Sequence, residues 1–213
     1  MANRLRFSIR AAYAHLREAD PVVGELIERH PPYAPRPGRD PYASLVRAIL
    51  YQQLAGSAAR AIQRRFHLLY GDDEDRTPTP EQILRSSDEQ LRGAGISRQK
   101  AGYLRDLAQH CADGALDFAA IAELGDDDVI ERLTAVHGVG EWTAQIFLLA
   151  ELGRPDVLPV GDLGVRNGMQ AAYGLADSPP PARAREIGAP WAPYRSVGSW
   201  YMWRAASTVT VSD

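Results

Sequence analysis

Apolar residues recur at steps of three and four along most of the chain. No long stretch alternates between apolar and polar residues in the manner of a β-strand. Alanine, leucine and arginine, which favour helices, are frequent in the periodic stretches. The pattern therefore predicts an all-α protein.

The first clear helix is predicted to begin after Asp40, which can serve as its N-cap, with Pro41 in the first turn. Its apolar positions share one side of the helix, so we expect this helix to lie in the core. These positions are Leu45, Val46, Ile49 and Leu50.

A second helix is predicted with Ser57 as its N-cap and an end near Gly71. Its apolar side should point inward, and it consists of Ile62, Phe66 and Leu69. Three shorter helical segments are expected between residues 77 and 117. Each begins with a proline or a serine, at Pro80, Ser87 and Ser97.

The second half of the chain predicts a pair of helices over residues 126–150, joined at a glycine-rich turn. A non-helical stretch at 157–161 precedes a helix that begins at about Asp162 and ends near Tyr173. The last helix is expected over residues 195–205, followed by a frayed polar tail from Ser207.

The net charge of −3 does not by itself indicate a nucleic-acid-binding protein. Acidic residues gather at 72–75 and 126–128, which leaves room for a basic face elsewhere. Only one of the 24 basic residues, Lys100, is a lysine.

Cys111 is the only cysteine, which excludes a disulfide or a cysteine-ligated metal cluster within one chain. The five histidines show no metal-ligand spacing. No apolar run reaches the roughly 18 residues that cross a bilayer, and no signal peptide is evident. We expect a cytoplasmic protein without structural zinc or contact with a membrane.

The turn Gly138-Val139-Gly140 lies between the two helices of 126–150. Two glycines around one aliphatic residue allow a tight backbone turn, with Val139 packed into the core. The turn opens the second helix, where unpaired N–H groups and the helix dipole favour a phosphate oxygen. Such a hairpin holds a DNA backbone without reading sequence, although the tripeptide alone predicts only a corner between two helices.

The wider pattern is more specific. Residues 133–144, L-T-A-V-H-G-V-G-E-W-T-A, resemble the helix-hairpin-helix of base-excision DNA glycosylases, in which a catalytic aspartate follows the hairpin. Asp162 stands 22 residues after Gly140, in L-P-V-G-D-L. Further likeness extends over R-A-I-L-Y-Q-Q-L, G-I-S-R-Q-K-A, P-Y-R-S and W-Y-M-W, at 47–54, 95–101, 193–196 and 200–203. The chain thus resembles the HhH-GPD superfamily, above all its AlkA-type 3-methyladenine DNA glycosylase II branch.

The resemblance implies a single two-lobed helical domain with the active-site cleft between the lobes and no N-terminal β domain. We expect one lobe at about 40–155, containing the hairpin at 126–150. The other lobe would combine 1–39 with 156–206, and 207–213 would form the tail. The implied partner is double-stranded DNA with a damaged base, bound by a monomer.

Cleavage of an N-glycosidic bond passes through a transition state like an oxocarbenium ion, which a carboxylate beside the sugar stabilises while it orients water. Asp162 is the catalytic candidate. The alternative is that Asp162 only caps its helix, and the two roles are compatible.

Bifunctional members of the superfamily carry a lysine two residues after the second hairpin glycine, for a Schiff base with the sugar. This chain has Trp142 there, and Lys100 belongs to another turn, so we expect hydrolysis without strand cleavage. A base alkylated on its ring is cationic and already a good leaving group. When it is flipped out and stacked on an electron-rich ring, the cation–π attraction contributes about 0.5 to 2 kcal/mol. By resemblance, the pocket would be lined by Trp142, Trp203 and Tyr51.

The resemblance also implies DNA contacts. Gln53 would insert into the hole left by the flipped base, where AlkA-type proteins have a leucine; the alternative is an ordinary surface residue. Hydrogen bonds to the DNA backbone would come from Gly138, Gly140 and Thr143. A structural monovalent cation (Na⁺ or K⁺) would be held by the backbone carbonyls of Thr134, Val136 and Val139, and no other cofactor is expected. Phosphate charge would be neutralised by Arg98, Lys100 and Arg166.

Three alternatives remain open at this point. The enzyme could instead release neutral lesions such as hypoxanthine or uracil. The chain could be a non-catalytic module that uses the hairpin for phosphate contacts alone. It could also recognise alkylated bases and release them only slowly. The sequence leaves this open, because the rate depends on placement to within about 1 Å, which composition does not reveal.

Overall fold

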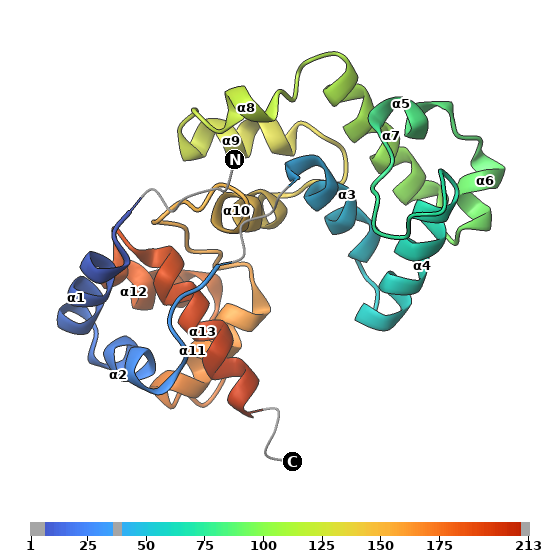
Figure 1. The fold of residues 1–213 in the computed structure, drawn as a ribbon. Helices are drawn as coiled ribbons and strands as arrows, with labels where there is room; N and C mark the ends of the chain where they lie inside the picture. The colour runs from blue at the N-terminus through green and yellow to red at the C-terminus, as the bar shows by residue number, and fades with distance from the viewer. Residues whose placement is uncertain (1–6, 36–39, 210–213) are drawn as a thin grey trace. The chain divides into compact units, whose positions relative to one another are not determined.

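The computed structural model describes residues 7–35 and 40–209 (Figure 1). These residues form thirteen α-helices and one 3-10 helix without any β-strand, which confirms the predicted all-α class. Within the same residues, no helix combines the length and the apolar character that crossing a membrane requires.

The chain divides into two compact units. One combines Met1–Arg39 with Leu148–Asp213, and the other is Asp40–Phe147. The boundary after Phe147 falls inside α10 (Glu141–Ala150), earlier than the position at about residue 155 that the resemblance implied. The Arg154 N–H donates to the Leu148 carbonyl at 3.0 Å, which ties the turn after α10 to the end of that helix.

The unit Asp40–Phe147 is built around α7 (Arg98–Ala112), which packs against α3, α5 and α6. Its other helices are α3 (Pro41–Tyr51), α4 (Gly56–Leu68), α5 (Pro80–Arg85), α6 (Asp88–Gly93), α8 (Phe118–Ile121), α9 (Asp126–Thr134) and the start of α10. The predicted stripe on α3 is buried, and Asp40 caps that helix by accepting the Ala43 N–H at 3.1 Å.

Helix α4 departs from its predicted start and apolar side. It begins at Gly56 after Ala55, with no side-chain cap, so Ser57 lies inside the first turn. The helix ends at Leu68, with Leu69 as its C-cap, and Leu69 is 38% exposed rather than inward-facing. Phe66 is fully buried as predicted.

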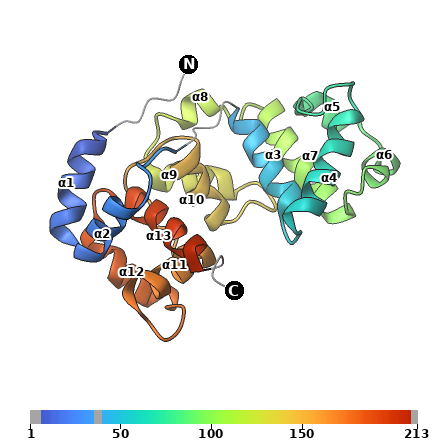
Figure 2. The same ribbon diagram turned by 60° about the horizontal axis from the view of Figure 1, so that its bottom comes forward.

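The other unit contains α1 (Ile9–Ala19), α2 (Pro21–Arg29), α11 (Leu163–Tyr173), α12 (Pro181–Gly188), the 3-10 helix η1 (Ala189–Trp191) and α13 (Arg195–Val209). Helices α11 and α13 lie side by side (Figure 1 and Figure 2). Their contact is so close that a Cβ on Gly168 would stand 1.9 Å from the Met202 carbonyl oxygen. Glycine at position 168 thus permits the packing of the two helices.

The N-terminal helices complete the core of this unit through Asp20. This buried carboxylate caps α2 by accepting the Val22 and Val23 N–H groups at 3.0 and 3.3 Å. It also accepts the Trp191 indole N–H at 2.8 Å and the Tyr173 hydroxyl. Asp20 therefore links α2 to η1 and α11.

The last helix is longer than predicted. It continues to Val209, and the Ser207 hydroxyl donates to the carbonyls of Trp203 and Arg204 at 3.1 and 2.9 Å. The prediction of a frayed tail from Ser207 was therefore wrong for residues up to 209, because serine continues a helix when its hydroxyl bonds back to the preceding turn. Residues 210–213 lie outside the described part of the chain.

Candidate catalytic and DNA-binding residues

Asp162 is the N-cap of α11, and its side chain has two defined donors. Its Oδ1 accepts the Val165 N–H at 2.8 Å and the Trp203 indole N–H at 2.9 Å. The carboxylate is half-buried. Two donors on one oxygen fix the orientation of the carboxylate, so helix capping and a chemical role are compatible here.

The contact between Asp162 and Trp203 depends on a second glycine of α11. A Cβ on Gly164 would lie 3.0 Å from Trp203 Cδ1 and 3.1 Å from Asp162 Oδ1. A side chain at position 164 would therefore push the indole away from the carboxylate. Asp162 and Trp203 were predicted separately from the sequence, whereas Gly164 was not, because its only signal was a glycine inside a predicted helix.

The loop that leads from α10 to Asp162 is held by an ion pair. The Arg195 guanidinium donates to both oxygens of Asp156, with Nε–Oδ1 at 2.6 Å and Nη2–Oδ2 at 2.8 Å, and the Arg195 N–H adds a bond of 3.2 Å. Burial opposes ionisation of Asp156, but the bonds from Arg195 prevail and lower the pKa of that carboxyl below its usual value. The start of α13 is thus fastened to the loop.

Two buried serines of α13 bind the same loop. The Ser196 hydroxyl donates to the Arg154 carbonyl at 2.6 Å and accepts the Val157 N–H at 2.9 Å. The Ser199 hydroxyl donates to the Val157 carbonyl at 3.2 Å. The P-Y-R-S segment noted in the sequence therefore holds the chain a few residues before Asp162.

The hairpin between α9 and α10 has the predicted geometry. Gly138 has a φ of +87°, and a Cβ there would lie 2.3 Å from the Tyr103 ring, so glycine is required on both counts. Val139 is buried, as predicted, and its N–H donates to the Val136 carbonyl at 3.0 Å. Gly140, directly before α10, is exposed, whereas Thr143 in the first turn of that helix is only 8% exposed.

The turn after α3 is joined to this hairpin. The Gln52 side-chain amide donates to the Gly138 carbonyl at 2.7 Å. Gln53 is exposed and adopts a φ of +56°. The sequence identified Gln53, but it gave no sign of the bond from Gln52 to the hairpin, which spans 86 residues.

The predicted aromatic residues lie in different units. Trp142 is 47% exposed in the first turn of α10, in the unit Asp40–Phe147. In the same unit, the Arg47 guanidinium lies 3.9 Å from the centre of the Tyr51 ring and donates to its hydroxyl at 2.8 Å. Trp203 belongs to the other unit with Asp162. Its indole N–H bonds to the Asp162 carboxylate within that unit.

The predicted phosphate-binding cations differ in their surroundings. Arg98 is exposed at the start of α7. The Lys100 ammonium instead donates to the carbonyls of Leu50 and Gln52, both at 2.7 Å. Arg166 is half-buried and donates to the Pro179 carbonyl at 3.3 Å. Arg98 thus has the exposure expected of a phosphate contact, whereas Lys100 and Arg166 also hold neighbouring backbone.

Leu163 is a further candidate for contact with a ligand, and it was not predicted from the sequence. It follows Asp162 directly and is 58% exposed. A large apolar side chain in water beside the candidate carboxylate is a surface on which an apolar or aromatic group can pack. The periodicity of α11 alone does not reveal its exposure.

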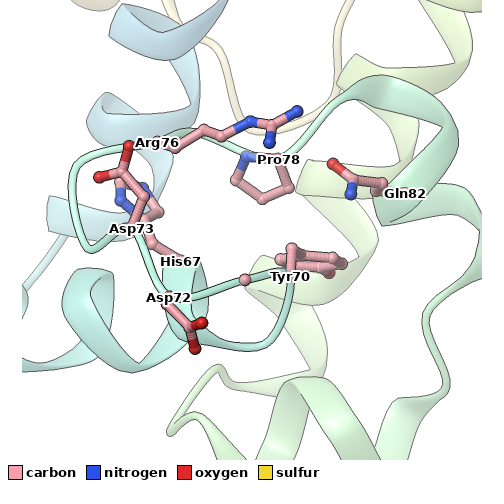
Figure 3. A pocket seen from close by; sticks show the side chains of 8 residues that line it. His67, Tyr70, Asp72, Asp73, Arg76, Pro78 and Gln82 are labelled. Carbon is pink, nitrogen blue, oxygen red and sulfur yellow. The ribbon is translucent and has the colours of Figure 1, made fainter.

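Two hollows within single units are separate from Asp162. One, of about 60 Å³, is lined by His67, Tyr70, Asp72, Asp73, Arg76 and Gln82 among others (Figure 3). It has room for about two water molecules, far less than the roughly 300–1,000 Å³ of small-molecule sites. The other, of about 370 Å³, lies among α2, α11 and α13. Neither lining includes Asp162.

The described residues contain no cluster of three or more histidine, cysteine, aspartate or glutamate side chains suited to a metal ion. The backbone carbonyls of Thr134, Val136 and Val139 belong to the end of α9 and the hairpin turn. Carbonyl oxygens are suitable ligands for a hard monovalent cation, so the chemistry of this set fits the group that the sequence suggested.

An all-α structure with a glycine-cornered hairpin, followed by an aspartate that caps the next helix, has the features of a helix-hairpin-helix DNA-repair protein. The comparisons agree. Residues 46–193 match the family described as "HhH-GPD superfamily base excision DNA repair protein", and the chain belongs to this family.

Named relatives within the family are similar over nearly the whole chain. DNA-3-methyladenine glycosylase 1 of Schizosaccharomyces pombe is 32% identical, over 93% of this chain and 88% of the relative. A solved structure of the S. pombe 3-methyladenine DNA glycosylase in complex with abasic DNA aligns with a TM-score of 0.81 at 32% identity, covering 91% of this chain and 95% of that one. A DNA-3-methyladenine glycosidase from Bacillus halodurans aligns with the same TM-score at 37% identity, covering 93% and 89%.

Proposed function

We propose that this chain is a monofunctional DNA glycosylase that hydrolyses the N-glycosidic bond of alkylated purines, such as 3-methyladenine and 7-methylguanine, in base excision repair. Membership of the HhH-GPD family and the names of the relatives support both the reaction and the class of base. The substrate would be double-stranded DNA, bound by a monomer at the bacterial nucleoid in the cytoplasm.

The observation that carries the proposal is the oriented carboxylate of Asp162. Donors from the α11 backbone and from the Trp203 indole hold its Oδ1 at 2.8 and 2.9 Å. As the bond to the base breaks, positive charge develops on the sugar, and a carboxylate held in place stabilises that charge without reorganising. The same carboxylate orients the attacking water.

The chain's lysine content favours hydrolysis over strand cleavage. A lyase step needs a free amine that attacks the sugar carbon and forms a Schiff base. Trp142 occupies the position two residues after Gly140, and the sole lysine, Lys100, donates to two backbone carbonyls. The abasic product would therefore leave the enzyme with its strand intact.

The aromatic residues suit a cationic base. A purine alkylated at a ring nitrogen carries positive charge, so it leaves without protonation and is attracted to electron-rich rings. The candidates for these rings are Trp142 and Tyr51 in one unit and Trp203 in the other. A neutral base gains less from such stacking, so the rings favour alkylated purines over hypoxanthine or uracil.

The hairpin would hold the DNA backbone. The N–H groups of Gly138 and Gly140 in the turn, and of Thr143 in the first turn of α10, would donate to phosphate oxygens. The dipole of α10 favours negative charge there. A Na⁺ or K⁺ ion on the carbonyls of Thr134, Val136 and Val139 would add positive charge next to the same phosphate. Further charge would come from Arg98 and Arg166.

A base-release assay tests the proposal. Duplex DNA containing 7-methylguanine or 3-methyladenine is incubated with the enzyme, and released base and strand breaks are measured separately. We expect released alkylated base, an intact strand before alkali treatment, and far slower release of uracil and hypoxanthine. Faster release from uracil or hypoxanthine DNA would contradict the alkylpurine assignment, and binding without release of any base would favour a non-catalytic module.

A further inference from the structure

The turn after α3 holds Gln53 in an unusual backbone conformation. Its φ of +56° is the only positive φ of a non-glycine residue in the part of the chain that the structure describes. A residue with a Cβ occupies this region at an energetic cost, so surrounding contacts must hold it there. Gln53 is exposed, so its own side chain is not packed into a core that could do so.

Lys100 provides one such contact. From the first turn of α7, its ammonium donates to the carbonyls of Leu50 and Gln52, both at 2.7 Å. These carbonyls lie at the C-terminal end of α3, where a helix leaves acceptors unpaired and a positive charge is favourable. Partial burial lowers the pKa of Lys100, in keeping with an ammonium that has exchanged part of its water for protein oxygens.

The bond to the Gln52 carbonyl acts directly on Gln53. That carbonyl and the Gln53 nitrogen belong to the same planar peptide group, so fixing the oxygen fixes the plane from which the φ of Gln53 is measured. The Gln52 side chain anchors the same residue a second time, because its amide donates to the Gly138 carbonyl of the hairpin at 2.7 Å. Both anchors act on the residue immediately before Gln53.

We propose that Lys100 is a positioning residue for base flipping, which holds the turn so that Gln53 projects outward for insertion into the space a flipped nucleotide leaves. This inference rests on the proposed function. The role differs from the phosphate contact that was expected from the sequence, because the Lys100 ammonium donates to backbone carbonyls of the protein.

A double-mutant cycle tests the inference. Lys100→Met keeps the aliphatic stem and removes the ammonium, and Gln53→Ala removes the inserting side chain. We expect Lys100→Met to slow single-turnover release of 7-methylguanine by about 10- to 100-fold, the scale of a misplaced group. In the Gln53→Ala background the same substitution should change the rate less than about twofold, because nothing remains to be positioned. An equal loss in both backgrounds would overturn the inference.

The salt dependence of DNA binding separates positioning from phosphate contact. If Lys100 neutralised a phosphate, Lys100→Met would reduce the slope of log K against log salt by about one. Positioning predicts an unchanged slope, as in the charge-matched control Arg85→Met, which alters an exposed arginine of α5. A slope reduced in Lys100→Met alone would refute the proposal.

Thermal unfolding checks that the variants are folded. If Lys100→Met does not fold, Gln52→Leu takes its place in the cycle, because it removes the other anchor and makes the same prediction. Absence of base release by the wild-type protein would count against the proposed function. Normal wild-type release with no effect of Lys100→Met or Gln52→Leu would count against the positioning role alone.

Discussion

The bond between Trp203 and Asp162 gives a quantitative prediction. Trp203→Phe retains an aromatic ring and removes the indole N–H that donates to Asp162 Oδ1 at 2.9 Å. A hydrogen bond to a charged group contributes about 1.5–3 kcal/mol, and partial exposure of the pair places the loss near the lower limit. If the bond serves the transition state, about 1.4 kcal/mol corresponds to about a tenfold slower release of base.

Single-turnover release of 7-methylguanine from duplex DNA measures this effect. Phenylalanine still stacks on a base, so affinity for abasic-site DNA should change little while the rate falls. In an Asp162→Asn background, Trp203→Phe should have a much smaller effect, because the charged partner is gone. An undiminished rate in Trp203→Phe, or the same loss in both backgrounds, would refute orientation of the carboxylate by the indole.

The remaining predictions concern glycines and one ion pair. Gly138→Ala should weaken binding to abasic DNA and lower the unfolding temperature, because a Cβ would overlap Tyr103; unchanged affinity would argue against the hairpin as the backbone contact. Gly168→Ala should lower the free energy of unfolding of its unit by about 1–3 kcal/mol in urea unfolding, because the added Cβ would overlap the Met202 carbonyl. An unchanged free energy of unfolding would contradict the close packing of α11 and α13. Folding lowers the pKa of Asp156, so its contribution to stability is present above about pH 4 and lost as the pH falls further. The gap in melting temperature between wild type and Asp156→Asn should therefore narrow in acid, and a gap independent of pH would contradict this role.

Local features of the fold could be predicted from the sequence where a single helix decides them. The stripe of α3 is buried because its spacing leaves one side free of polar residues, and Asp40 caps the helix as expected. The start of α4 at Gly56 was not predictable from capping preferences, because no side chain caps it. The predicted inward position of Leu69 was wrong, since this residue is the C-cap of α4 and is 38% exposed.

The candidate site was predictable as a set of residues and not as a set of contacts. Asp162 and Trp203 are 41 residues apart, and they meet because Gly164 and Gly168 let α11 and α13 approach each other. From the sequence, Lys100 was expected to be a surface cation that contacts phosphate. Its carbonyl partners lie about 50 residues earlier in the chain, so local sequence does not indicate these bonds. Contacts between distant helices depend on packing, which periodicity does not encode.

Base release by Asp162→Asn tests the central claim most directly. Asparagine is as good an N-cap as aspartate and has the same shape, so the fold and the binding of abasic DNA should persist. Loss of the carboxylate charge should slow release of 7-methylguanine by about 100-fold or more. Release at the wild-type rate by this variant would contradict Asp162 as the group that stabilises the sugar cation.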